Sequence, residues 1–170
     1  MDIISHGLWG SLAFGRSNRK NFSWAFLFGV APDLFSFGIF SISTFIGLED
    51  RIDWSTPPHE HTHLIPDYVY SLYNVTHSLV IFAAVFLLVY LILRKPFWPM
   101  LAWGLHIVLD MFTHYKEFFA TPFLWPLSDF KMDGTNWSEA YIFFPNVLLL
   151  IVLYAWFYFS RRSNAPTPKN

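Results

Sequence analysis

The sequence contains no cysteine and few charged residues. Without cysteine the chain can form neither a disulfide nor a thiolate metal site, so any metal must be held by His, Asp, Glu or oxygen ligands. Charged residues make up 14% of the chain, against about 25% in an ordinary soluble domain. The net charge of −1 gives no support for nucleic-acid binding. The sequence therefore favours a membrane protein.

Several sequence signals are also missing. The N-terminus has no basic stretch ahead of an apolar core and no small-residue cleavage site, so we do not expect a signal peptide. No Gly-x-Ser-x-Gly motif is present, which argues against a serine hydrolase. No Walker-type loop or dinucleotide fingerprint is present either. We find no internal repeat of fixed period.

Apolar segments are what the chain has in abundance, since 54% of its residues are hydrophobic and 21% are aromatic. About 20 apolar residues cross a bilayer as a helix. The stretch 3–15 is too short, and its Gly7, Gly10 and Ser11 predict close helix contacts. We therefore predict an all-α fold, a polytopic membrane helical bundle with about four spans and a short N-terminal helix. The four longer apolar segments are 21–47, 78–93, 97–115 and 141–159.

The charge pattern predicts domain organisation and orientation. We expect one membrane-embedded helical domain over residues 1–162 and a polar C-terminal tail over 163–170, with polar connections at 48–76 and 116–139. If the four segments alternate, the basic residues that bound them share one side, and the positive-inside rule makes that side and the C-terminus cytoplasmic. These residues are Arg16, Arg19, Lys20, Arg94, Lys95, Arg161 and Arg162.

Five ionisable residues in or beside the apolar segments are candidate metal ligands. His106 and Asp110 are four apart and share one helix face. A buried carboxylate is costly unless it is compensated, and a divalent metal would compensate it. At about 1.5 Å of rise per residue from the cytoplasmic end, His6 lies ~15 Å up, Asp33 ~20, His77 ~26, His106 ~17 and Asp110 ~23 Å. Because they share one depth band, we expect them to bind one or two divalent ions, zinc or manganese. The alternative is a structural His–Asp hydrogen bond between helices.

Neighbouring polar residues can complete such a site. Thr76, Ser78 and Thr113 flank the candidate ligands, so we expect them to orient those ligands. Asp2 lies one turn before His6, and His114 lies one turn beyond Asp110, so either can add a ligand. For His114 an interfacial histidine is an equally good interpretation.

The polar connections contain two further patterns. His59, His61 and His63 alternate, so in an extended chain they would point one way and could capture metal at the outer mouth. A solvated loop is the alternative interpretation. The aromatic-proline stretch 123–126 is expected to form a lid or wall over the site.

The order of these motifs resembles that of the bacterial and archaeal family of inner-membrane metal-dependent hydrolases, which is distantly similar to zinc-dependent phospholipase C and the P1-type nucleases. The resemblance runs from Met1 to about Ser128. It rests on Asp2-x-x-x-His6-Gly7, Pro32-Asp33, Thr76-His77-Ser78, His106-x-x-x-Asp110-x-x-Thr113 and Leu124-Trp125-Pro126-Leu127-Ser128.

This resemblance implies a phospholipase C-like helical hydrolase fold in a bacterial or archaeal cytoplasmic membrane. It also implies zinc-like ions, a phosphoester substrate, and a ligand set of His6, Asp33, His77, His106 and Asp110. Two places differ from the family pattern. Phe35 stands where a second acidic residue is common, and residues 72–74 (Leu-Tyr-Asn) replace a frequent His-Arg-Gly.

We therefore expect a membrane-embedded metal-dependent hydrolase that cleaves a phospholipid or lipid-linked phosphate with metal-activated water. His77, His106 and Asp110 are the expected catalytic residues, and the expected partner is a membrane lipid or lipid-like substrate. Two alternatives stay open. One is a metal-ion or proton transporter or channel, which inverted repeats and a polar path to both faces would favour. The other is a non-catalytic membrane adaptor whose His/Asp pairs hold helices together.

Overall fold

The computed structural model describes residues 1–52 and 58–163. Within these residues every regular element is helical, which confirms the predicted all-α class. The elements are α1 (Ile3–Phe14), α2 (Arg19–Asp33), the π-helical turn η1 (Leu34–Gly38), α3 (Ile39–Phe45), the 3₁₀ helix η2 (Pro58–Leu64), α4 (Asp67–Thr76), α5 (Leu79–Leu93), the 3₁₀ turn η3 (Trp98–Met100), α6 (Leu101–Thr113) and α7 (Ala140–Ser163).

Two of the described helices are long and apolar enough to span a membrane. One is the continuous rod of α2, η1 and α3, residues Arg19–Phe45, and the other is Ala140–Ser160 within α7. Helices α4 and α5 add a third if they form one span, because they meet at a bend of 56°. Helix α6 has 13 residues, about 20 Å of helix, which is shorter than the hydrocarbon core of ~30 Å. The four-span count therefore stays a prediction.

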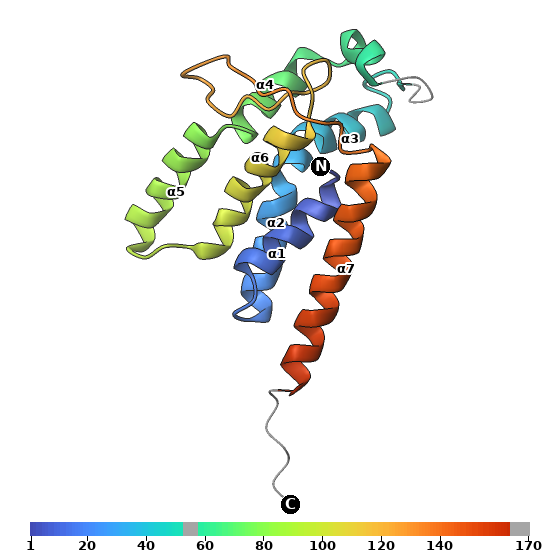
Figure 1. The fold of residues 1–170 in the computed structure, drawn as a ribbon. Helices are drawn as coiled ribbons and strands as arrows, with labels where there is room; N and C mark the ends of the chain where they lie inside the picture. The colour runs from blue at the N-terminus through green and yellow to red at the C-terminus, as the bar shows by residue number, and fades with distance from the viewer. Residues whose placement is uncertain (53–57, 164–170) are drawn as a thin grey trace, which may run out of the picture.

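The helices are arranged around a central group of α1, α2 and α6, with α5 and α7 on opposite sides (Figure 1). Helices α3 and α4 and the segment 116–139 gather at one end. The α1–α2 turn, the α5–α6 connection and the C-terminal end of α7 lie at the other end (Figure 1). These three places hold the basic residues of the orientation argument, so the fold brings them toward one end. The compartment that this end faces stays a prediction.

Small residues let α1 lie close to its neighbours, as predicted. A Cβ added at Gly10 would lie 2.7 Å from the Ala102 Cβ and 2.8 Å from the Ala25 carbonyl oxygen. A Cβ at Gly29 would lie 2.6 Å from the His6 carbonyl oxygen. Such distances are shorter than van der Waals contact, so only glycine permits these helix crossings.

Pro32 does not break the second helix. The chain continues through the π-turn η1, which begins directly after Asp33. The Ser36 hydroxyl donates to the Pro32 carbonyl oxygen at 3.1 Å. A π-turn adds one residue to the turn and so changes the register of the helix, and such turns are common at functional sites.

The prediction that residues 48–76 form a polar connection needs correction, because this segment contains the helices η2 and α4. Ile65, Val69 and Tyr73 recur every four residues, which is helical spacing, and they pack with Phe40 and Phe119 in a buried cluster. The polar residues between them lower the average hydropathy of the segment. The average hydropathy of the segment therefore gave no sign of this amphipathic helix.

His59, His61 and His63 do not lie in an extended chain, which was the condition for metal capture at the outer mouth. Residues Pro58–Leu64 form a 3₁₀ helix, in which successive residues are rotated by about 120°, so residues two apart do not share a face. The side chain of His59 lies outside the described part of the chain. The polar tail predicted after Ser163 lies outside the described residues too.

Candidate metal centre

Four buried side chains from three parts of the chain converge in the centre of the helical bundle. Asp33 ends α2, His77 stands at the bend between α4 and α5, and His106 and Asp110 occupy one face of α6. One ligand atom from each residue lies within 4.8 Å of those of the other three. His77, His106 and Asp110 are at most 1% exposed, and Asp33 is 9% exposed. This cluster can hold a metal ion.

The distances between these ligand atoms are short. His77 Nε2 lies 3.0 Å from His106 Nε2, 3.4 Å from an Asp33 carboxylate oxygen (Oδ1) and 3.5 Å from Asp110 Oδ2. His106 Nε2 lies 3.7 Å from the same Asp33 oxygen and 3.1 Å from Asp110 Oδ2. Asp110 Oδ2 is buried and has no hydrogen-bond partner.

The outer nitrogens of the two histidines determine which way these imidazoles face. His106 Nδ1 lies 2.6 Å from the Gly29 carbonyl oxygen, and His77 Nδ1 lies 3.2 Å from the Tyr73 carbonyl oxygen. A carbonyl oxygen only accepts, so in the neutral imidazoles the proton is on Nδ1 and the lone pair is on Nε2. The two Nε2 lone pairs and the two carboxylate oxygens therefore face one another without a hydrogen between them. A cation at this point would remove the unfavourable contacts.

The second carboxylate oxygen of Asp110, Oδ1, faces a second set of polar groups. Oδ1 lies 2.9 Å from His6 Nε2 and 3.3 Å from His114 Nε2. The Met1 nitrogen lies 2.5 Å from this oxygen and 3.1 Å from His114 Nε2. His114 Nδ1 donates to the Phe119 carbonyl oxygen at 3.1 Å, so its Nε2 lone pair is also turned toward Asp110. Asp110 therefore lies between two groups of potential ligands.

Thr76 and Thr113 lie where the sequence places residues that orient the ligands. Thr76 Oγ1 is 3.0 Å from His77 Nδ1, and it donates its own hydrogen to the Leu72 carbonyl oxygen at 2.9 Å. Thr113 Oγ1 is 3.4 Å from Asp110 Oδ1. Both hydroxyls contact a candidate ligand and can hold its orientation.

Ser78 and Asp2 have different contacts. Ser78 caps α5 by accepting from the Ile81 amide at 3.1 Å, and it donates to the Trp125 carbonyl oxygen. Asp2 caps α1, because its Oδ1 accepts from the Ser5 amide at 2.9 Å, while its Oδ2 is buried without a partner. The structure thus assigns both residues to helix capping, and neither belongs to the four-residue cluster.

The stretch 123–126 packs against the start of α5. The Phe123 carbonyl oxygen accepts from the Leu79 amide at 2.9 Å, and the Trp125 carbonyl oxygen accepts from Ser78. Because Ser78 directly follows His77, the stretch 123–126 is bonded to the residue next to a candidate ligand. Its role as a lid stays a prediction.

Sequence reasoning did not identify the carbonyl oxygens that orient the histidines. These belong to Gly29, Tyr73 and Phe119, and a backbone oxygen has no signature in the sequence. One indirect signal exists for Gly29, because a glycine inside an apolar helix often marks a close helix crossing. Tyr73 has a second contact that was missed, since its ring stacks on His77 with the centroids 3.7 Å apart.

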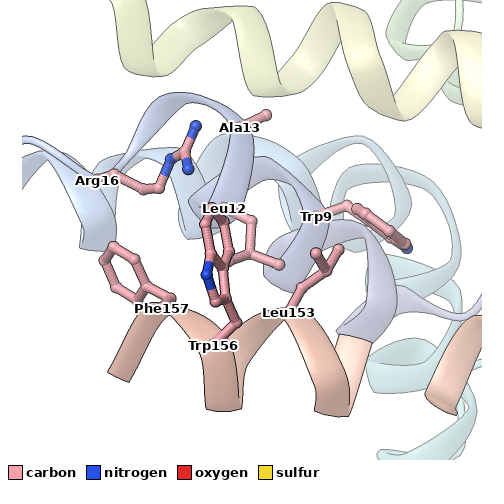
Figure 2. A pocket seen from close by; sticks show the side chains of 7 residues that line it. All are labelled: Trp9, Leu12, Ala13, Arg16, Leu153, Trp156 and Phe157. Carbon is pink, nitrogen blue, oxygen red and sulfur yellow. The ribbon is translucent and has the colours of Figure 1, made fainter. Parts of the chain in front are cut away.

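A separate pocket lies between α1 and α7 and is shown in Figure 2. It has a volume of about 220 Å³, and none of the cluster residues lines it. Arg16 stands near one end of this pocket and Trp9 near the other (Figure 2). The remaining walls are Leu12, Ala13, Leu153, Trp156 and Phe157.

The fold and the cluster together define a helical protein with two helices long enough to cross a membrane and a buried His/Asp group that can hold a metal ion. Comparisons with protein-family models, with curated proteins and with solved structures found no match to this chain.

Proposed function

We propose that this protein is a membrane-embedded metal-dependent hydrolase that cleaves a phosphoester of a lipid or lipid-linked phosphate. The observation that carries the proposal is the convergence of two histidine lone pairs and two carboxylate oxygens in a buried position. Such an arrangement without a cation leaves several buried acceptors unpaired, which costs free energy for each of them.

The spacing of the ligand atoms supports zinc. Bonds of about 2.0–2.1 Å in tetrahedral geometry separate the ligand atoms by about 3.3–3.4 Å. Five of the six distances among the Nε2 atoms and carboxylate oxygens range from 3.0 to 3.7 Å and so bracket this value. The sixth, between the two carboxylates, is within 4.8 Å. The donor set of nitrogen and oxygen without thiolate also suits manganese.

The other oxygen of Asp110 is the candidate position for a second ion, which would have to displace the Met1 ammonium that lies 2.5 Å from this oxygen. His6 Nε2 and His114 Nε2 face Asp110 Oδ1 at 2.9 and 3.3 Å. Asp110, His6 and His114 would then hold this second ion, and two ions would supply the chemistry of a two-metal hydrolytic site. His114, which the sequence offers as an additional ligand, would then join the proposed ligand set.

A divalent ion at this position supplies a Lewis acid that acidifies water and polarises a phosphoryl oxygen. The chain's own residues provide the rest. His77 and His106 keep their Nε2 lone pairs turned inward, because Tyr73 and Gly29 accept from their Nδ1 atoms. Burial of the cluster excludes bulk water, which strengthens the attraction between the site and a phosphate group.

The proposal is tested with protein in mixed micelles, stripped of metal with chelator and reconstituted with zinc. Two substrates are compared: phosphatidylethanolamine and the water-soluble diester bis(4-nitrophenyl) phosphate. We expect zinc-dependent release of a phosphate product from at least one of them, with loss of this activity in Asp33→Asn. Stoichiometric zinc binding without hydrolysis of either would refute hydrolysis of these diesters and favour a metal-binding or transport role.

A further inference from the structure

A second cavity is lined by residues that adjoin two candidate metal ligands in the chain. It has a volume of about 340 Å³ and lies between α2, α4 and α6, within the range of about 300–1,000 Å³ of small-molecule pockets. Two of its lining residues, Pro32 and Thr76, directly precede the candidate ligands Asp33 and His77 in the chain. The other lining residues are Phe28, Ala31, Phe35, Leu72, Val75 and Trp103.

The chemistry of this pocket excludes a polar occupant. Its lining includes two side chains with a hydrogen-bond donor, and each donates to backbone. Thr76 donates to the Leu72 carbonyl oxygen at 2.9 Å, and the Trp103 indole donates to the Thr76 carbonyl oxygen at 2.6 Å. No charged side chain lines the pocket. The pocket between α1 and α7 differs in this respect, because Arg16 lines it (Figure 2).

The position of the pocket indicates that its ligand comes from the membrane. Ala31 and Phe35 lie 12 and 16 residues after Arg19, so they are about 18–24 Å along the membrane-length rod. Phe35 is 58% exposed and Val75 is 41% exposed, so the pocket wall reaches the apolar outer surface of the bundle. In a membrane that surface is covered by hydrocarbon chains.

We infer that this pocket binds a hydrocarbon chain of the substrate itself, so that a lipid enters from the membrane with its phosphate at the metal centre. The inference rests on the proposed function and adds the substrate class: a phosphoester attached to a long alkyl, acyl or isoprenoid chain. Chain binding beside the ligands places the phosphate by proximity, which makes productive orientation less costly.

The test is photolabelling in lipid nanodiscs, because labelling requires binding and not hydrolysis. The probe is phosphatidylethanolamine with a diazirine in its acyl chain, and labelled residues are mapped by mass spectrometry. We expect labels at Leu72 and Trp103, which are only partly exposed, in addition to labels on outward residues such as Leu149 of α7. Labels confined to outward residues would overturn the inference.

Ala31→Trp fills the pocket and is the discriminating variant. We expect it to reduce labelling at Leu72 and Trp103 about tenfold, equivalent to about 1.4 kcal/mol of binding, with labelling at Leu149 unchanged. Val75→Trp at the rim provides the same test should the first variant fold poorly. Ala84→Trp is the matched control, since Ala84 is exposed on α5 and lies outside the pocket, and it should label like the wild type.

The two proposals fail in different ways. Zinc-bound protein with unchanged Leu72 and Trp103 labelling in both pocket variants would overturn the chain pocket and leave the metal centre standing. If the pocket variants abolish the labelling but the wild type binds no zinc, the chain-binding pocket would be supported and the hydrolase proposal would be refuted.

Discussion

Replacing Asp33 by asparagine distinguishes a metal centre from a structural ion pair by the sign of a stability change. In the metal-free protein, the Asp33 oxygen faces the lone pairs of His77 at 3.4 Å and His106 at 3.7 Å. Asn has the same shape but brings an amide hydrogen. Asp33→Asn therefore converts a contact between acceptors into a hydrogen bond.

The expected size follows from the cost of an unpaired buried acceptor, about 1–3 kcal/mol. We expect the free energy of unfolding of metal-free Asp33→Asn to be higher than that of the metal-free wild type by about 1–2 kcal/mol. For a chain of this length, 1 kcal/mol corresponds to about 2–4 °C in Tm, so the gain is about 2–8 °C. With zinc present we expect the wild type to have the higher Tm, because only the wild type keeps all four ligands.

The assay is thermal unfolding followed by tryptophan fluorescence in detergent, with chelator and then with zinc. Asp129→Asn is the matched control, since Asp129 is exposed in the 116–139 segment and should change neither Tm. A structural pair predicts the opposite result. If His77 were an imidazolium bound to Asp33, removing the carboxylate would destabilise the metal-free protein by about 3–5 kcal/mol, and a loss of that size would refute the reasoning.

Three further predictions follow from the packing and the contacts around the ligands. Gly29→Ala should lower stability by about 1–3 kcal/mol in the same melts, because its Cβ would lie 2.6 Å from the His6 carbonyl oxygen. Thr76→Val should weaken zinc affinity about 10–100-fold in a competition titration, since it removes the oxygen 3.0 Å from His77 Nδ1; unchanged affinity would contradict an orienting role. Asn146→Ala should cost about 1–3 kcal/mol, because its amide joins α7 to two α1 side chains at 2.8 Å each.

The sequence was informative where polar residues are rare. His106 and Asp110 stand out because their surroundings are apolar, and the depth estimates for Asp33 and His77 place them at a similar level. The structure brings these four ligand atoms within 4.8 Å of one another. The fifth predicted residue, His6, contacts the other oxygen of Asp110, and its ring stacks on His106 with the centroids 3.7 Å apart.

Other features could not be inferred because their cause is not local. Helix α4 was hidden since polar residues separate Ile65, Val69 and Tyr73, whose burial depends on Phe40 and Phe119 far away in the chain. The carbonyl oxygens that orient the histidines depend on how helices cross. Helix capping also competes with ligand orientation for Ser78 and with metal binding for Asp2, and the sequence alone does not decide between these uses of an oxygen.

The most direct test of the central claim is the metal content of detergent-purified protein, measured by elemental analysis for wild type and Asp110→Asn side by side. Asp110 contacts both groups of potential ligands, so its loss removes the shared carboxylate. The account predicts one or two equivalents of zinc or manganese in the wild type and loss of that metal in the variant. A well-folded wild type without metal, purified from metal-supplemented buffer, would contradict the account and leave His106 and Asp110 as a structural pair.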